Sequence, residues 1–215
     1  MTDWKSRLSG RFVVFDGPDG SGKSTQLQRF TDFCQRESVD PVVAREPGGT
    51  PIGEAIRQVL LDPRYEEMEL RCEMLLYMAS RSQLMTERIK PALRDGRFVL
   101  ADRFISSTLA YQGTAGGLDP EEIRAVGAVA TRGCAPDLVV IFDVDEETAA
   151  GRMSSDLDRM ERKGGEFHRR VRQGYLAQAE HDPERHLVID ASRSEPEVFD
   201  ALIAGLAQRL PATVA

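Results

Sequence analysis

The sequence predicts an α/β fold in which a five-stranded parallel sheet lies between two layers of helices. Five short apolar runs recur along the chain, longer stretches with helical spacing separate them, and a glycine-rich loop follows the first run. The 215 residues, 41% of them hydrophobic, suffice for one core but not comfortably for two. We therefore expect a single domain over residues 1–215 with a mobile insert.

The strands are expected at the five apolar runs, because strands buried on both faces are nearly continuously apolar. These runs are residues 11–16, 41–45, 97–102, 138–144 and 186–190. Helices are expected at residues 25–38, 52–61, 69–89, 120–132, 146–152, 166–180 and 195–210, with prolines 63 and 91 breaking the region around the third. Ligands of such sheets bind at the carboxyl ends of the strands, so the residues after each strand are site candidates.

The loop after the first strand fills the pattern G-x-x-x-x-G-K-[ST] at every fixed position. Its backbone N–H groups and the following helix N-terminus bind phosphate, Lys23 reaches the outer phosphates, and Ser24 offers a hydroxyl to the Mg²⁺ of a nucleoside triphosphate. A chance glycine-rich turn is disfavoured by the strand before the loop and the helix after it. The expected fold is that of a P-loop NTPase. The expected ATP-binding residues are Gly17, Pro18, Asp19, Gly20, Ser21, Gly22, Lys23, Ser24 and Thr25.

Composition excludes several classes of partner. A formal net charge of −7 argues against nucleic acid. No apolar run is long enough for a membrane span and the polar start lacks a signal peptide, so we expect a cytoplasmic protein without a membrane partner. Cys34, Cys72 and Cys134 are odd in number and far apart, and we expect reduced core thiols.

Two strand ends carry candidate anion sites. Residues 45–50 join Arg45 to a Pro-Gly-Gly turn containing Pro47, and Arg57 follows on the next helix. A simple turn and a solvated arginine remain open alternatives at this point. Asp102 and Arg103 end the third strand, where a carboxylate suits Mg²⁺ and a guanidinium suits phosphate. A surface ion pair is the alternative reading.

Two further segments suit a nucleotide site. Tyr77 and Arg81 share a helix face and are able to hold a flat base, although Tyr77 also fits the apolar stripe of that helix. Between residues 152 and 172 there are seven basic residues against four acidic ones, with two glycines in the middle. This suits a lid that closes on phosphates, or else a solvated helical face.

Taken together, these segments resemble the thymidylate kinases over nearly the whole chain. The resemblance rests on the Arg-Glu-Pro-Gly-Gly-Thr segment at 45–50, on Arg81, and on Asp-Arg-Phe at 102–104 with the Ala-Tyr-Gln-Gly segment at 110–113. It implies transfer of the γ-phosphoryl group of ATP to dTMP, giving dTDP and ADP for dTTP synthesis. It also implies Mg²⁺ and a homodimer.

The resemblance also implies residue roles. Asp19 faces the acceptor sugar, Arg81 bonds the thymine edge, and Tyr77 stands where the family commonly has a stacking phenylalanine. The implied substrate-binding residues are Asp19, Arg45, Pro47, Arg57, Tyr77, Arg81, Arg103, Ser107, Thr108, Tyr111 and Gln112. Ser24 and Asp102 are the implied metal ligands, and Lys23, Arg159, Arg103 and Asp19 the catalytic residues.

The resemblance assigns the catalytic cation to the lid. No arginine occupies the variable loop positions, and Leu157 to Glu161 matches a lid pattern, so Arg159 is implied as the charge that stabilises the transferring group, with Arg152 and Arg162 as second choices. The chain is thus expected to be one nucleoside monophosphate kinase domain with a phosphate loop at 17–24 and a lid at about 152–166. The alternatives are a kinase for another nucleoside monophosphate or a deoxynucleoside, and a non-catalytic ATP-binding module.

Overall fold

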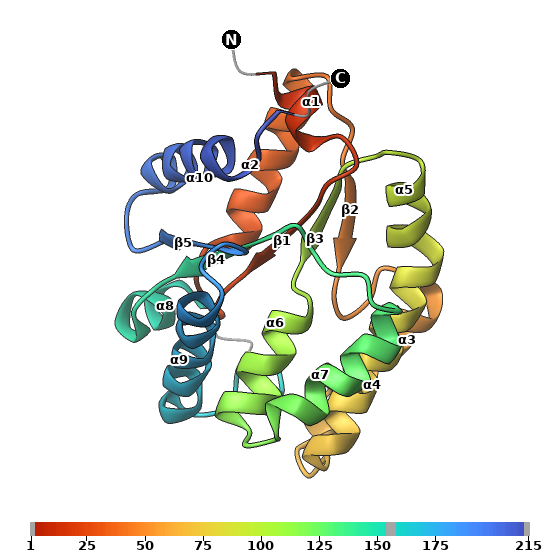
Figure 1. Cartoon of the computed structure of the whole chain (residues 1–215). Helices are drawn as coiled ribbons and strands as arrows, with labels where there is room; N and C mark the ends of the chain where they lie inside the picture. Colours follow the sequence, from red (N-terminus) through yellow and green to blue (C-terminus); the bar gives the residue numbers. More distant parts are fainter. Residues whose placement is uncertain (1–2, 154–157, 213–215) are drawn as a thin grey trace.

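Five parallel strands form the central sheet in the order β2-β3-β1-β4-β5 (Figure 1). The computed structural model of the chain describes residues 3–153 and 158–212. The strands are β1 (Phe12–Asp16), β2 (Val42–Arg45), β3 (Val99–Asp102), β4 (Leu138–Asp143) and β5 (His186–Asp190). The α/β fold with a parallel sheet flanked by helices is therefore confirmed.

Helices alternate with these strands along the chain. They are α1 (Trp4–Leu8), α2 (Lys23–Arg36), α3 (Pro51–Leu61), α4 (Leu70–Leu84), α5 (Lys90–Arg94), α6 (Ile105–Thr108), α7 (Pro120–Thr131), α8 (Glu146–Arg152), α9 (Gly165–His181) and α10 (Glu195–Arg209). A short 3₁₀ turn, η1 (Pro63–Tyr65), follows α3, and π-helical segments η2 (Met85–Ile89) and η3 (Leu109–Ala115) continue α4 and α6. No helix within the described ranges is long and apolar enough to span a bilayer.

Two separate cores cover the two faces of the sheet. On one face α1, α2 and α10 pack against the strands through residues such as Phe15, Phe30 and Leu202 (Figure 1). On the other face α9 and the α4 to α6 region bury Phe104 and Tyr175. Alternate strand residues point to opposite faces, which is why every residue of β1 is buried.

The register of the strands brings several predicted site residues to one edge. Asp102 at the end of β3 is paired with Phe15 of β1 and with Arg45 of β2. Gly17 follows β1 with a φ of +145°, and a side chain there would place Cβ 2.6 Å from the carbonyl oxygen of Phe142. The phosphate loop can therefore curl over this edge only because glycine stands at that position.

The strands lie within two residues of their expected bounds. The helices differ more, because α1, η1, α5 and the α6–η3 segment were not expected, and Pro91, expected to break the helical region, lies inside α5. Cys72 is exposed and Cys134 half-buried, so the expectation of core thiols is right only for Cys34, because α4 turns Cys72 outward. Burial raises the pKa of the Cys34 thiol to about 12.

Candidate active site

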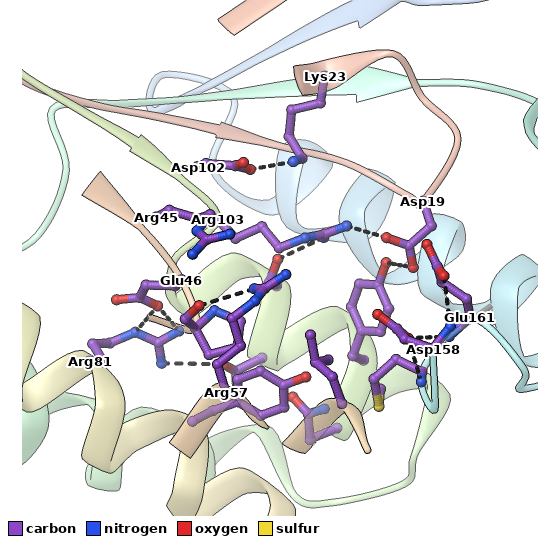
Figure 2. Close-up of a pocket in the computed structure, with 18 of the residues that line it drawn as sticks. Asp19, Lys23, Arg45, Glu46, Arg57, Arg81, Asp102, Arg103, Asp158 and Glu161 are labelled. Carbon is purple, nitrogen blue, oxygen red and sulfur yellow. Dashed lines mark hydrogen bonds and ion pairs between the residues drawn. The ribbon is translucent and has the colours of Figure 1, made fainter. Parts of the chain in front are cut away.

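A cavity of about 250 Å³ opens at the carboxyl edge of the sheet, beside the phosphate loop (Figure 2). We call it the central cavity. It brings together residues from α2, α3, α4, η3 and the strand ends, far apart in sequence. All eleven substrate-binding residues expected from the sequence line it: Asp19, Arg45, Pro47, Arg57, Tyr77, Arg81, Arg103, Ser107, Thr108, Tyr111 and Gln112. Lys23, Ser24 and Asp102 line it as well.

Lys23 is held at the first turn of α2 and is only 7% exposed. Its ammonium group pairs with the carboxylate of Asp102 from β3 (Figure 2). Burial, and then the nearby charge of Arg103, lower the pKa of Lys23. The phosphate loop therefore presents a nearly dehydrated cation to the central cavity, where its field on an anion is less screened than in water.

Arg103 joins the phosphate loop to the central cavity. It follows β3 with a φ of +67°, a conformation uncommon outside glycine. Its Nη2 donates to Asp19 Oδ1 at 2.5 Å, and its Nη1 donates to the carbonyl oxygen of Gly17 at 3.0 Å. The hydroxyl of Tyr111 donates to the other Asp19 oxygen at 2.8 Å. Asp19 and Tyr111 thereby meet at one wall of the cavity.

Asp16 supports the position of Arg103 through the hydroxyl of Tyr175. This carboxylate at the end of β1 is fully buried and accepts hydrogen bonds from Ser106 and Ser107 at 2.6 Å and from the hydroxyl of Tyr175 at 2.5 Å. Arg103 Nη1 in turn donates to the Tyr175 hydroxyl at 3.0 Å. The sequence did not point to Asp16 and Tyr175, because no motif shows which buried polar groups of distant elements meet.

Three guanidinium groups gather on the central cavity from different elements. Arg45 at the end of β2 pairs with Glu54 at 2.8 Å, and Arg57 on α3 donates to the carbonyl oxygen of Pro47 at 3.0 Å. Burial, and then the charge of Arg45, lower the pKa of Arg57. Together with Arg103, which lines the same cavity, the arrangement suits a multiply charged anion.

Arg81 lies deeper, on α4, and is 1% exposed. Its Nε donates to Glu46 Oε2 at 2.7 Å and its Nη1 donates to Thr108 Oγ1 at 3.2 Å. Burial raises the pKa of Glu46 to about 7, although Arg81 acts in the opposite direction. Glu46 Oε1 is buried without a hydrogen-bond partner among the described residues. Glu46 was quoted in the sequence motif but was not expected to be a site residue.

Arg159 is not brought to the central cavity. It is 3% exposed, its Nη2 pairs with Glu73 of α4 at 2.5 Å, and its Nε donates to the carbonyl oxygen of Leu60 at 2.7 Å. Its neighbours Asp158, Met160 and Glu161 line the cavity instead. They belong to the lid pattern but were not expected to be site residues. Packing against α4 holds the Arg159 guanidinium away from the cavity lining, and its expected catalytic role stays a prediction. Leu157 of the lid pattern lies outside the described residues.

A second cavity, of about 310 Å³, lies on the other side of the phosphate loop, and we call it the loop cavity. Gly20, Gly22 and Thr25 line it together with Arg152 of α8 and Arg193, which precedes α10. Arg152 Nη1 donates to the carbonyl oxygen of Ala191 at 2.8 Å. Of the arginines that the sequence suggested for the lid, Arg152 is the one that borders this cavity.

The donor set fits Mg²⁺ bound mainly through phosphate oxygens and water. The Ser24 hydroxyl and the Asp102 carboxylate both line the central cavity. The described residues contain no group of three or more His, Cys, Asp or Glu side chains arranged to hold a metal. Mg²⁺ typically takes one or two protein ligands and completes its shell with phosphates and water.

Comparison with known proteins identifies the family. A sequence model described as Thymidylate kinase matches residues 15–202. The thymidylate kinase of Pelotomaculum thermopropionicum is 45% identical over 92% of this chain and 98% of its own length, and that of Exiguobacterium sp. is 45% identical over 94% and 98%. The thymidylate kinase of Enterococcus faecalis is 43% identical over 95% of this chain and 99% of its own length. Since matches of this identity cover nearly the full length of both partners, the chain belongs to the thymidylate kinase family.

Proposed function

We propose that this chain transfers the γ-phosphoryl group of ATP to dTMP, giving dTDP and ADP for dTTP synthesis. The observation that carries the proposal is the convergence of eleven expected acceptor-site residues on one cavity that also contains Lys23 of the phosphate loop. Donor and acceptor groups then meet at the carboxyl edge of the sheet. The names of the family and of its relatives agree with this acceptor.

The phosphate loop binds the donor. Backbone N–H groups of residues 19–25 and the N-terminus of α2 bind the phosphates, and Lys23 neutralises the outer ones. Mg²⁺, when bound at Ser24 and Asp102, neutralises phosphate charge. The loop cavity, with Arg152 and Arg193 on its wall, takes the rest of the donor nucleotide.

The central cavity binds the acceptor. Arg45, Arg57 and Arg103 hold its phosphate, and Pro47 shapes the wall beside them. At the other end Arg81 and Thr108 bond the base edge with Gln112, while Tyr77 stacks on its face. Asp19 and Ser107 lie near the sugar, and Tyr111 packs where a 2′-hydroxyl would clash, which favours deoxyribose.

Catalysis comes from positioning and charge neutralisation. The acceptor phosphate is already a nucleophile at neutral pH, so no general base is required. Lys23 and Arg103 flank the path of the transferred group, and Asp19 orients both Arg103 and Tyr111. The resemblance assigns the catalytic cation to Arg159, whose guanidinium pairs with Glu73 in this structure, and this role stays a prediction.

We further propose that the chain forms a single kinase domain and that it works as a homodimer in the cytoplasm. Exposed apolar side chains lie on helices that pack side by side: Val59 of α3, Leu75 of α4 and Val129 of α7. Val129 is 79% exposed, which is high for a valine on a helix that also packs into the protein. Exposed apolar side chains of this kind support self-association.

The test is ADP release measured with a panel of nucleoside monophosphates and without acceptor. We expect dTMP to give the highest kcat/KM, with dUMP and the ribonucleotides well below it. Preference for another monophosphate, or for a deoxynucleoside, would assign the site to that acceptor instead. ATP turnover that no acceptor increases would indicate a regulatory ATP-binding module.

A further inference from the structure

Glu73 is a buried carboxylate that the chemistry described so far does not use. It lies on α4 and is 1% exposed, and it is not among the residues that line the central cavity. Its Oε1 accepts a hydrogen bond from Gln112 Nε2 at 2.7 Å. Its Oε2 pairs with Arg159 at 2.5 Å and with Lys163 at 3.4 Å. A carboxylate in such a place is tolerated only when charges and hydrogen bonds compensate its lost hydration.

These contacts fix the orientation of the Gln112 amide. An amide group has nearly the same shape in its two flipped orientations, and its hydrogen-bond partners decide between them. With two cations on Oε2, the Glu73 carboxylate is an acceptor only. Gln112 must therefore turn its NH₂ group toward Glu73. Its carbonyl oxygen is left on the opposite side, with no hydrogen bond among the described residues.

The orientation matters because Gln112 lines the end of the central cavity that also contains Arg81 and Thr108. A carbonyl oxygen there accepts from the N3–H group of thymine or uracil. Cytosine offers a lone pair at N3 and is repelled by the same oxygen. A site built to bond one pattern of donors and acceptors rejects the analogue that inverts it.

We propose that Glu73 is a positioning residue that holds the carbonyl oxygen of Gln112 toward the acceptor base and so sets the preference for thymine over cytosine. The inference rests on the proposed dTMP acceptor. Through Arg159 and Lys163 the same carboxylate also ties this end of the central cavity to the segment that follows the undescribed residues 154–157.

The test uses Glu73→Gln in the full-length enzyme, because an amide of the same shape can donate as well as accept and no longer dictates the Gln112 flip. We measure kcat and KM with dTMP, dUMP and dCMP. The ratio of kcat/KM for dTMP to that for dCMP falls about tenfold or more, chiefly through KM for dTMP, while KM for ATP changes less than about threefold. An unchanged ratio would overturn the proposal.

Two further variants separate positioning from a general loss of packing. Lys163→Gln removes a cation from Oε2 without touching Gln112, and the ratio stays near that of the wild type. Gln112→Met lowers the ratio by itself, and adding Glu73→Gln then lowers it no further. An additional loss of the same size in the Gln112→Met background would show that Glu73 acts by another route.

If Glu73→Gln does not fold, Gln112→Met still decides the test. A wild-type ratio of kcat/KM for dTMP to that for dCMP in Gln112→Met would contradict the proposal directly. Failure of the wild type to use dTMP would instead refute the proposed function. A wild type that prefers dTMP combined with an unchanged ratio in the variants refutes only the role of Glu73.

Discussion

Arg103 Nη2 lies 2.5 Å from Asp19 Oδ1, so the guanidinium that follows β3 is bound to a carboxylate inside the phosphate loop (Figure 2). The pair spans the boundary between the donor loop and the central cavity. Because Arg103 also bonds Gly17 and Tyr175, its position is set from several sides. A change in α9 that affects Tyr175 is therefore expected to shift Arg103 and so to alter binding of the acceptor phosphate.

Tyr175→Phe tests this coupling with a minimal change. The variant keeps the ring in the core but removes the hydroxyl that accepts from Arg103 and donates to Asp16. We expect KM for dTMP to rise several-fold with KM for ATP nearly unchanged, and the free energy of unfolding to fall by about 1–3 kcal/mol. Steady-state kinetics with each substrate varied measure the two KM values, and thermal melting measures the stability. An unaltered KM for dTMP would mean that Tyr175 only fills space.

Arg81→Ala should weaken acceptor binding and stability together. Arg81 is buried against Glu46, and its removal leaves that carboxylate without its cation. Breaking a buried pair in this way costs about 3–5 kcal/mol of stability. We expect the double variant Arg81→Gln with Glu46→Gln to recover much of the stability but not the KM for dTMP. If KM for dTMP and for ATP rise equally, Arg81 does not serve the acceptor.

Glu46 gives a pH dependence with a defined sign. Burial raises its pKa from an ordinary 4.5 to about 7, so between these values the folded state binds more protons than the unfolded state. Stability from this group is therefore full below about pH 4.5 and falls as the pH rises through 7. In Glu46→Gln this titration is absent. As the pH rises from about 5 to about 8, the Tm of the wild type should therefore fall relative to that of Glu46→Gln. A rise of the wild-type Tm relative to the variant over this range would contradict the raised pKa.

Arg159→Ala separates two roles of one side chain. Its buried pair with Glu73 predicts a loss of stability of about 3–5 kcal/mol, which melting measures. Its expected role as the catalytic cation predicts about a hundredfold lower kcat at a temperature where the variant is folded, with smaller changes in KM. Should kcat survive in Arg159→Ala but fall in Arg152→Ala, the catalytic charge belongs to Arg152.

Much of the site was predictable because motifs fix local geometry. The strand before Gly17, the helix after Lys23 and the segment at 45–50 place their side chains at one sheet edge as soon as the strands are parallel. The partners of these side chains were not predictable. Glu73, which meets Gln112 and Arg159, has no local sequence signal, because its contacts depend on how α4 packs against η3 and the segment after residue 157.

The short elements were missed for a related reason. The helix α1 is five residues long, and α6 continues into the π-helical η3. Segments of this length form through tertiary packing rather than through their own periodicity. Trp4 and Leu8 of α1, for example, are buried against the core that contains Phe30.

The most direct measurement follows the labelled γ-phosphate of ATP in the presence of dTMP, with Lys23→Ala as the matched control. Lys23 is the buried cation at the outer phosphates, and removing a positioned charge of this kind typically costs a factor of about 10²–10³ in kcat. We predict that the wild type places the label in the β-phosphate of dTDP, and that Lys23→Ala melts cooperatively yet transfers almost none. Label released only as inorganic phosphate, or transfer by Lys23→Ala within a few-fold of the wild type, would contradict phosphoryl transfer to dTMP at this phosphate loop.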